Sequence, residues 1–487
     1  MKLGELMKLS GIVHDNNSDL EITGVSYNSL KTQPGELFVC ISGFSTDGHK
    51  YAKSAQDAGA AAILAERPLD EVTIPVIIVE NGRKALSAVS AAFYGRPSDG
   101  MKVFGVTGTN GKTTISYLLR AIVEASGHEC GVLGTIAYVY GGKTFESVNT
   151  TPESFELQRM FYEMKEEYSI DHCAMEVSSH SLALSRTDDI SFDYSVFTNL
   201  TPDHMDFHTD FEDYFAAKKK LFQQTSGTSV INIDDQYGKR LYEELLAEGK
   251  KVLACSVEDE TAYYRAIIRD SSANGTNADI FAGQEKLGSV KINTPGRFSV
   301  ANAVCAIGVT LEAGISWEAA KAGIEQTRGV SGRFESVENS HGIPVIVDYA
   351  HTPDALEKII KTAREFTEGR VITVFGCGGD RDATKRPVMG EIAGRYSDFC
   401  VVTSDNPRTE DPHKILEDII PGIDKTECPY EVVEDRRRGI KRALKEWNQG
   451  DTVIIAGKGH ENYQIIGTVK HHFDDKETAM QIIEQEL

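Results

Sequence analysis

Short apolar runs of strand length alternate with amphipathic segments of helix length from residue 99 onward. Strand candidates in the first part of this region lie at residues 102–107, 172–177, 194–198, 230–233 and 251–254, and helix candidates at 113–125, 154–167, 211–223 and 299–313. This alternation predicts an α/β fold with helices on both faces of a doubly wound, mostly parallel sheet. Ligands of such sheets bind beyond the carboxyl ends of the strands, so the residues after each strand are the first candidates for a site.

A chain of 487 residues is too long for a single core and predicts about three domains. Two glycine-containing turns, at residues 94–100 and 327–333, separate the patterned regions. We therefore expect a small α/β N-terminal domain at 1–98, a central doubly wound domain at 99–330 and a Rossmann-like C-terminal domain at 331–487. Strand candidates of the last domain lie at 345–348, 371–375, 399–403 and 452–456.

A glycine-rich turn joins the strand candidate 102–107 to the helix that follows it. The turn reads Gly108, Thr109, Asn110, Gly111, Lys112, Thr113, Thr114. Strand, glycine-rich turn and helix N-terminus together predict a phosphate-binding P-loop, although Val106 stands where the usual spacing has its first glycine. Lys112 would contact the outer phosphates and Thr113 would bind Mg²⁺. An ordinary glycine turn with a solvated lysine is the alternative, and both flanks argue against it.

Acidic and histidine residues follow two further strands of the central region. Glu176 ends one strand candidate, and Asp203, His204 and Asp206 follow another. Oxygen ligands with one imidazole favour Mg²⁺ over zinc. The pair of His204 and His208 is weak evidence by itself, and the two aspartates could instead cap the next helix.

Lys218 lies in the middle of an apolar helical stripe. The stripe is formed by Phe211, Tyr214, Phe215, Leu221 and Phe222, which recur at helical spacing. A cationic lysine on a buried stripe is costly unless it is paired, neutral or covalently modified. Extension of the ammonium to solvent is the simpler interpretation from the helix alone, and a desolvated lysine with a chemical role is the alternative.

Three strands of the last region are followed by charged loops that contain glycine or proline. These loops lie at residues 376–382, 405–411 and 457–461. We interpret them as one pocket for a zwitterionic ligand, in which Arg408 holds a carboxylate and Glu461 an ammonium group. Three unrelated solvated loops, with Arg408 paired to Glu410 or Asp411, are the alternative.

The balance of charge limits the classes of partner. The chain has 51 Lys and Arg against 73 Asp and Glu, a formal net charge of −22. Because nucleic acids and anionic membranes bind basic surfaces, we expect neither as a partner, and no membrane insertion. The eight cysteines contain no Cys-x-x-Cys pair, and residues 1–12 show no signal peptide. We expect a cytoplasmic monomer that acts on small molecules.

Together these motifs resemble the Mur ligases of peptidoglycan synthesis over the whole chain. The resemblance is carried by residues 108–114, 149–152, 176–180, 199–206, 216–218, 302, 332–335, 348–353, 405–408 and 457–461. Their order and spacing are far more specific than any single motif. The resemblance implies an ATP- and Mg²⁺-dependent ligase that adds meso-diaminopimelate to UDP-N-acetylmuramoyl-L-alanyl-D-glutamate through an acyl phosphate. It also implies that the first domain binds the UDP-N-acetylmuramoyl (UDP-MurNAc) group, the central domain ATP and the last domain the amino acid.

The resemblance also assigns roles to individual residues. It makes Glu176 and His204 ligands of Mg²⁺ and matches Lys218 to a lysine that CO₂ converts to a carbamate. Asn302, Arg333 and Asp348 match nucleotide contacts. Contacts to the muramoyl peptide match Asn149, Thr150, Thr151, Ser178, Leu184 and Arg186, and Ser29 matches a uridine contact. The amino-acid pocket matches Arg381, Asp405, Asn406, Pro407, Arg408, Gly457 and Glu461. Phe44 and Leu184 replace a histidine and a glutamine of some relatives.

Two other functions compete with this interpretation. A lysine-adding or folylpolyglutamate-type ligase of the same superfamily is the first; Arg408 argues against lysine, and the N-terminal domain with Ser29 argues against folate. A P-loop switch that hydrolyses ATP and forms no amide is the second. Arg408 would favour diaminopimelate because this amino acid carries a distal carboxylate where lysine has none.

Overall fold

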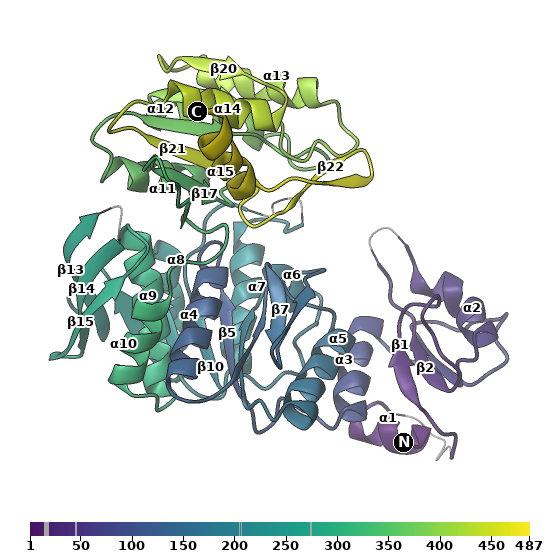
Figure 1. Cartoon of the computed structure of the whole chain (residues 1–487). Coiled ribbons are helices and arrows are strands. Elements are labelled where there is room, and N and C mark those ends of the chain that lie inside the picture. Colours follow the sequence, from purple (N-terminus) through teal and green to yellow (C-terminus); the bar gives the residue numbers. More distant parts are fainter. Residues whose placement is uncertain (14–18, 44–45, 204, 206, 273–274) are drawn as a thin grey trace.

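The computed structural model describes residues 1–13, 19–43, 46–203, 205, 207–272 and 275–487. Three large sheets and a two-stranded hairpin organise these residues, and the chain passes through the three large sheets in order (Figure 1). Helices lie beside each sheet, so the predicted α/β class with parallel sheets is confirmed. No described helix is both long enough and apolar enough to cross a bilayer.

The first sheet has four parallel strands in the order β1-β2-β3-β4. Its elements are α1 (Leu3–Leu9), β1 (Gly24–Ser26), β2 (Glu36–Val39), η1 (Gly48–Tyr51), α2 (Ala52–Asp57), β3 (Ala62–Ala65), β4 (Val76–Ile78) and α3 (Gly82–Phe93). Asn81 caps α3 by accepting hydrogen bonds from the amides of Arg83 and Lys84. The hydroxyl of Tyr27 donates to Glu156 of α5, a helix beside the second sheet, at 2.9 Å. This hydrogen bond connects the first sheet region to the second.

The second sheet has the order β15-β14-β13-β12-β11-β10-β5-β9-β6-β7-β8 among the described residues. Its strands are β5 (Lys102–Thr107), β6 (Cys130–Leu133), β7 (Ala137–Tyr140), β8 (Lys143–Glu146), β9 (His172–Glu176), β10 (Tyr194–Phe197), β11 (Ser229–Asn232), β12 (Val252–Ser256), β13 (Tyr264–Ser272), β14 (Gly275–Ala282) and β15 (Glu285–Ile292). Its helices are α4 (Lys112–Ala125), α5 (Ser154–Tyr162), α6 (Ser179–Ala183), α7 (Phe211–Gln224), α8 (Gln236–Ala247), α9 (Arg297–Glu312) and α10 (Trp317–Gln326), with the π-helical η2 (Glu163–Glu167). The neighbours from β6 to β13 through β9 and β5 are parallel, as expected for a mostly parallel sheet.

Antiparallel strands that the sequence patterns did not predict extend both ends of this sheet. The meander β13-β14-β15 extends one end and β7-β8 the other. β8 is exposed throughout and β13 becomes exposed along its length, so neither shows the continuous apolar pattern of a buried strand. Separate apolar clusters on the two faces of the central strands contain α4, α9 and α10 on one side and α5, α7 and α8 on the other.

The third sheet has the order β16-β17-β21-β18-β19-β20, parallel except for β16. Its strands are β16 (Glu335–Ser336), β17 (Val345–Asp348), β18 (Val371–Phe375), β19 (Phe399–Val402), β20 (Tyr430–Val432) and β21 (Thr452–Ala456). Its helices are α11 (Pro353–Arg364), α12 (Lys385–Tyr396), α13 (Pro412–Ile423), α14 (Arg436–Glu446) and α15 (Asp475–Glu486). A hairpin of β22 (Tyr463–Ile466) and β23 (Val469–His472), also absent from the sequence prediction, stands beside it. The third sheet and its helices lie above the second in Figure 1.

Candidate functional site

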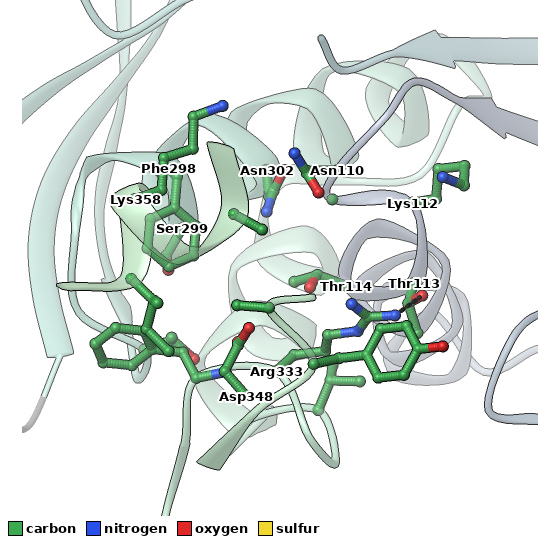
Figure 2. Close-up of a pocket in the computed structure, with 18 of the residues that line it drawn as sticks. Asn110, Lys112, Thr113, Thr114, Phe298, Ser299, Asn302, Arg333, Asp348 and Lys358 are labelled. Atoms are coloured by element: carbon green, nitrogen blue, oxygen red, sulfur yellow. Dashed lines mark hydrogen bonds between the residues drawn. The ribbon is translucent and has the colours of Figure 1, made fainter. Parts of the chain in front are cut away.

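A cavity of about 280 Å³ lies where residues after strands of the second and third sheets meet. The second sheet contributes residues that follow β5, β9 and β10, and the third contributes residues at and after the end of β17. The lining includes Asn110, Lys112, Thr113, Thr114, Glu176, Asp203, Asn302, Arg333, Asp348, His351 and Lys358 (Figure 2). The geometry therefore brings together most of the residues that the sequence assigned to a nucleotide site.

The glycine-rich turn has the backbone of a phosphate-binding loop. Gly108 and Gly111 have φ of 143° and 91°, and α4 begins immediately afterwards at Lys112. The ammonium of Lys112 donates to the carbonyls of Gly108 and Thr109 at 2.9 and 2.8 Å, so the side chain folds back along the loop. Burial lowers the pKa of Lys112. An anion at the N-terminus of α4 would meet unpaired amides and a desolvated cation.

Asn302 approaches this loop from α9. A Cβ atom on Gly111 would lie 2.6 Å from Oδ1 of Asn302, which is closer than real Cβ contacts allow. Gly111 is thus required both for its left-handed backbone and for this close approach. Asn302 lines the cavity beside the loop, as Figure 2 shows.

Glu176 is buried at the carboxyl end of β9 and faces the cavity. Its Oε1 accepts a hydrogen bond from the amide of Thr135 at 2.8 Å, and its Oε2 accepts one from the Thr135 hydroxyl at 3.0 Å. The same hydroxyl lies 3.0 Å from that of Thr150. Sequence reasoning missed Thr135, which lies between two strands without a motif of its own; it orients both carboxylate oxygens.

Lys218 is 2 % exposed, so its ammonium does not extend to solvent as the simpler interpretation held. Its Nζ donates to the carbonyl of Gly108 at 2.9 Å and lies 4.6 Å from the centre of the Tyr214 ring. Burial and the nearby Lys112 ammonium lower the pKa of Lys218 well below its ordinary value. The structure therefore places beneath the glycine-rich turn a lysine whose cationic form is disfavoured by burial.

Of the histidine pair in the sequence analysis, only His208 lies among the described residues. His204, together with Asp206, lies outside the described residues. The imidazole of His208 lies 3.0 Å from a carboxylate oxygen of Asp213 and 2.9 Å from the hydroxyl of Ser179. His208 is buried and holds α6 and α7 together, which is a structural role.

Arg333, which precedes β16 of the third sheet, contacts the glycine-rich turn of the second-sheet region. Its Nη2 donates to the Thr113 hydroxyl at 3.1 Å, and its guanidinium stacks over the Tyr349 ring at 4.8 Å. Asp348 accepts a hydrogen bond from the amide of Phe334 at 2.6 Å, and burial raises the pKa of its carboxyl group. Both residues line the cavity, opposite the turn.

The residues matched to the muramoyl peptide lie in two places. The Thr151 hydroxyl, which is buried, donates to the Glu176 carbonyl at 2.8 Å and accepts a hydrogen bond from the Ser178 amide at 3.0 Å. Arg186 donates to the Thr151 carbonyl at 3.0 Å. Thr150 and Ser178 line the cavity, whereas Asn149, Leu184 and Ser29 do not; Ser29 lies in the turn after β1.

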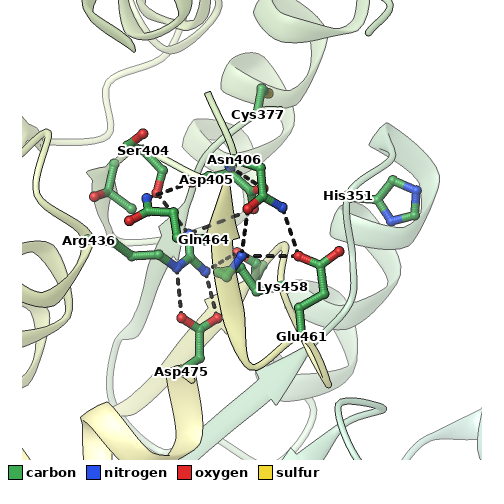
Figure 3. Close-up of polar contacts among 12 residues, drawn as sticks. His351, Cys377, Ser404, Asp405, Asn406, Arg436, Lys458, Glu461, Gln464 and Asp475 are labelled. Carbon is green, nitrogen blue, oxygen red and sulfur yellow. Dashed lines mark hydrogen bonds and ion pairs between the residues drawn. The ribbon is translucent and has the colours of Figure 1, made fainter. Parts of the chain in front are cut away.

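Loops after β19 and β21 form one hydrogen-bonded network (Figure 3). Nδ2 of Asn406 donates to Glu461 at 2.8 Å, and the ammonium of Lys458 donates to both Asn406 and Glu461 at 3.1 Å. Burial raises the pKa of the Asp405 carboxyl group, but Lys458 and Arg436 outweigh it and hold that pKa below its ordinary value. A Cβ on Gly457 would lie 2.7 Å from Oδ2 of Asp405. The alternative interpretation, in which the charged loops are unrelated and solvated, is therefore wrong.

Arg408, in the loop after β19, connects this network to the loop at residues 376–382. Its Nη1 donates to the Gly379 carbonyl at 2.9 Å, and its backbone has φ of 52°. Glu410 pairs instead with Arg386 at 2.9 Å, and Asp411 caps α13, so the alternative pairing of Arg408 is not formed. Pro407 is buried, whereas Arg381 is exposed and donates to the carbonyl of Asp380.

Sequence reasoning also missed the residues that support this network from beneath. Lys458 is fully buried, and the ion pair of Arg436 and Asp475 has both side chains fully buried with 2.7 Å between charged atoms. Gln464 of β22 donates to the Asp405 carbonyl at 2.6 Å. The signal for Lys458 was its place in the glycine-flanked loop; Arg436 and Asp475 begin helices and had no such signal.

Three family models match the chain in order. They are the Mur ligase family catalytic domain at residues 21–94, the Mur ligase middle domain at 106–310 and the Mur ligase glutamate ligase domain at 332–459. The chain is 46% identical over 480 residues to UDP-N-acetylmuramoyl-L-alanyl-D-glutamate–2,6-diaminopimelate ligase of Clostridioides difficile (strain 630), covering 98% of this chain and 99% of that protein. The enzyme of the same name from Clostridium botulinum (strain ATCC 19397 / Type A) is 45% identical over 476 residues, with 96% of each chain covered.

Solved structures give the same picture of the fold. A structure of UDP-N-acetylmuramoyl-L-alanyl-D-glutamate–2,6-diaminopimelate ligase matches with a TM-score of 0.71 and 30% identity, covering 99% of both chains. A folylpolyglutamate synthase of Mycobacterium tuberculosis, complexed with ADP and AMPPCP, matches with a TM-score of 0.62 and 18% identity but covers only 76% of this chain. The second likeness concerns the fold alone.

Proposed function

The chain belongs to the Mur ligase family, and we propose that it is an ATP-dependent ligase that joins meso-diaminopimelate to UDP-N-acetylmuramoyl-L-alanyl-D-glutamate. The observation that carries the proposal is a phosphate-binding loop in the cavity between the second and third sheets, together with a buried charged network formed by loops after strands of the third sheet. Relatives that match nearly the whole chain carry the name of this activity. Its place is the cytoplasm, where ATP and the uridine nucleotide are available.

The reaction has two steps in this proposal. The γ-phosphoryl group passes from ATP to an oxygen of the terminal carboxylate of the nucleotide peptide, and ADP leaves. The amine, as its free base, then attacks the carbonyl carbon; phosphate leaves with the transferred oxygen, and the new amide nitrogen loses a proton. Phosphoryl transfer depends mainly on positioning and charge neutralisation, which the turn at residues 108–114 supplies through its amides and Lys112. Asn302, Arg333 and Asp348 hold the rest of the nucleotide.

Mg²⁺ fits the oxygen donors at the phosphate end of the cavity. The Thr113 hydroxyl and the Glu176 carboxylate line this end, and both are hard ligands of the kind Mg²⁺ prefers. Thr135 fixes the carboxylate from behind, so Glu176 is pre-oriented. In this proposal Thr113, Glu176 and His204 hold the ion, which neutralises charge on the transferred phosphoryl group. Thr113 exchanges its contact with Arg333 for this role.

A carbamate on Lys218 fits the surroundings of that side chain. Only a neutral amine adds CO₂, and burial favours the neutral form of Lys218. The modification exchanges a buried cation beside Lys112 for an anion, which turns a repulsion into an attraction. Lys218 would then support the P-loop and the metal end of the site from below.

Diaminopimelate fits the network in the third region. In this proposal Glu461, Asp405 and the Gly457 backbone receive an ammonium group, while Arg408, Asn406 and Arg381 hold carboxylates. Arg408 contacts described residues through Nη1, which leaves the rest of its guanidinium for a ligand. A carboxylate held by a guanidinium fork is a contact that lysine cannot make. Pro407 shapes the loop.

The acceptor substrate extends from the cavity toward the first sheet. We assign its peptide to Asn149, Thr150, Thr151, Ser178, Leu184 and Arg186 and its uridine to Ser29. Thr151 acts through its contacts to Glu176 and Ser178, since its side chain is buried. The ranges 1–98, 99–330 and 331–487 would then bind the uridine nucleotide, ATP and the amino acid.

Phosphate release under three conditions tests the proposal. The protein receives ATP, Mg²⁺ and the nucleotide dipeptide, together with meso-diaminopimelate, with lysine or with no amine. We expect rapid release only with diaminopimelate, and a product whose mass exceeds that of the acceptor by diaminopimelate minus water. Faster turnover with lysine would contradict the choice of amine. Release that is independent of both acceptor and amine would identify an ATPase switch instead.

A further inference from the structure

Two histidines and an aspartate meet at the amino end of the second sheet, away from the cavity. Nδ1 of His172 lies 2.6 Å from Oδ1 of Asp171, and Nδ1 of His128 lies 3.7 Å from the same oxygen. The three side chains each offer a ligand atom within 4.8 Å of the others, and the two imidazole rings lie 4.7 Å apart. Nothing in the proposed ligase reaction uses them.

The backbone holds all three residues in place. Gly127, two residues after the end of α4, has φ of 89°, and the amide of His128 donates to the Val123 carbonyl at 3.3 Å, which closes the helix end in a Schellman-type turn. The carbonyl of Asp171 accepts a hydrogen bond from the Lys102 amide at 2.7 Å, and His172 pairs with both β5 and β6. The three residues thus lie at a helix end and at the start of a central strand, which are rigid parts of the fold.

The distances suit a divalent transition metal. Zinc bonds to imidazole nitrogen and carboxylate oxygen at about 2.0–2.2 Å, so neighbouring ligand atoms lie roughly 3 Å apart. The observed 2.6 and 3.7 Å bracket this spacing, and His128, whose side chain is half-exposed, can close the longer gap by turning its ring. Two imidazoles with one carboxylate select Zn²⁺, Co²⁺ or Ni²⁺ over Mg²⁺.

A hollow of about 550 Å³ opens beside His128 and His172. Its other walls are the turn at residues 313–316 and the start of α10. Water from this hollow can complete the coordination of a metal with three protein ligands. Lys102 also lines it, but its ammonium is directed to the Ala313 carbonyl at 3.3 Å.

We propose that His128, Asp171 and His172 form a binding site for a divalent transition metal of the zinc class, separate from the Mg²⁺ of the ligase reaction. A metal there would join the turn that follows α4 to the start of β9. The opposite ends of these two elements carry Lys112 and Glu176. The site would therefore brace the base of the phosphate-binding unit and stabilise the fold without contact with substrate.

Binding of Co²⁺ and Zn²⁺ to the full chain, without nucleotide and with Mg²⁺ in large excess to fill the ligase site, tests this site. We expect one equivalent of Co²⁺ with a ligand-field absorption spectrum typical of mixed nitrogen and oxygen ligands, displaced by Zn²⁺. Because loss of even an outer-shell partner weakens metal binding about 10–100-fold, His128→Asn should weaken it at least this much. Saturation with Zn²⁺ should raise the Tm of the wild-type protein by about 2–5 °C.

Two further variants make the result decisive. His413→Asn is the matched control, because His413 also faces a carboxylate, Glu434 at 2.8 Å, but belongs to no cluster of three ligand residues among the described residues; it should bind both metals as the wild type does. Asp171→Asn repeats the test in case His128→Asn disturbs the helix end, and it should also lose binding. Equal affinity of the wild type, His128→Asn and Asp171→Asn would overturn the proposal, as would the absence of Co²⁺ binding to the wild type.

Discussion

Lys218 lies in an environment far from the one that its ammonium group prefers in water. It is buried beside a second lysine and under the carbonyl of Gly108. A buried lysine lowers the stability of the fold unless it is neutral or modified. If Lys218 had a structural role alone, an apolar side chain could replace it with little loss of stability. Its chemistry is therefore open to a direct test.

Replacement of Lys218 by alanine should lower kcat about 100-fold or more, the range for loss of a charged group that organises a reacting phosphate. Short carboxylates such as acetate or formate should restore part of the activity, because they replace the carbamate oxygens. Lys219→Ala is the control: Lys219 is the next residue and pairs at the surface with Glu244 and Glu248, so activity should be retained. Full activity of Lys218→Ala would refute the role.

Arg408→Lys should reduce the preference for meso-diaminopimelate over lysine about 10–100-fold, since an ammonium cannot reproduce the two-pronged contact of a guanidinium. The measurement is the ratio of kcat/KM for the two amines. Arg395→Lys, on the exposed face of α12 and paired with Glu391, controls for a general effect of the exchange. An unchanged ratio in Arg408→Lys would remove Arg408 from the pocket.

Residues with an unusual sequence position were predictable, and residues that act through others were not. The helical stripe predicted that Lys218 lies on a buried face, and the glycine-rich turn predicted the position of Lys112. Thr135 and Arg436 had no such signal in the sequence. The residues around an isolated threonine, or around an arginine that begins a helix, look the same whether the side chain lies at the surface or in a buried network. Only the fold brings their partners close.

At the level of elements, the turn before α4 depends on a glycine for two reasons. Gly111→Ala should weaken ATP binding about 10-fold or more, because the new Cβ meets Asn302 in addition to the left-handed backbone cost of about 1–2 kcal/mol. Gly249→Ala is the control for a glycine with a left-handed backbone outside the cavity: its φ is 74°, and nothing lies within 4 Å of the added atom. Nucleotide binding by calorimetry should be weakened in the first variant and unchanged in the second.

The buried ion pair between α14 and α15 should be essential for the third region. Asp475→Asn leaves the guanidinium of Arg436 without its partner, which typically costs about 3–5 kcal/mol in unfolding free energy. Glu486→Gln removes an exposed partner of Arg437 and Lys441 and should leave stability unchanged. Denaturant unfolding compares the two variants; equal stability of both would show that the buried pair contributes nothing.

Central elements were predictable to within one or two residues, whereas edge elements were missed. β5, β18 and β21 match the apolar runs residue for residue, because strands buried on both faces have a continuous pattern. β8 and β23 are exposed at every residue and therefore lack it. The hairpin matters for the site, since the amide of Arg408 donates to the Ile465 carbonyl on β22.

At the scale of the molecule, Asp354 of α11 connects the third-sheet region to two loops of the second-sheet region beside the cavity. Its Oδ2 accepts hydrogen bonds from Asn110 at 2.8 Å and Thr201 at 3.1 Å. Loss of one or two such bonds, at about 1 kcal/mol each, should raise the KM for ATP roughly 5–30-fold in Asp354→Ala. Glu357→Ala, about one turn further along α11 and paired with Lys361, is the control and should leave the KM unchanged.

The relative placement of the regions was not predictable from pattern. The sequence indicated that functional residues follow strands, but not that Arg333 reaches Thr113 or that Asp354 reaches Asn110. Such contacts depend on the rigid-body arrangement of two sheets, which no local propensity encodes. The resemblance to a family, by contrast, implied three domains with a shared site.

The central claim is that ATP activates the carboxylate that the amine then attacks. Nucleotide dipeptide labelled with ¹⁸O in its terminal carboxylate tests it directly, when turned over in unlabelled water with ATP, Mg²⁺ and meso-diaminopimelate. Transfer of one carboxylate oxygen requires one ¹⁸O atom in each phosphate released, read by mass spectrometry. Phosphate that contains no ¹⁸O would show that water cleaves the nucleotide, and would contradict the account.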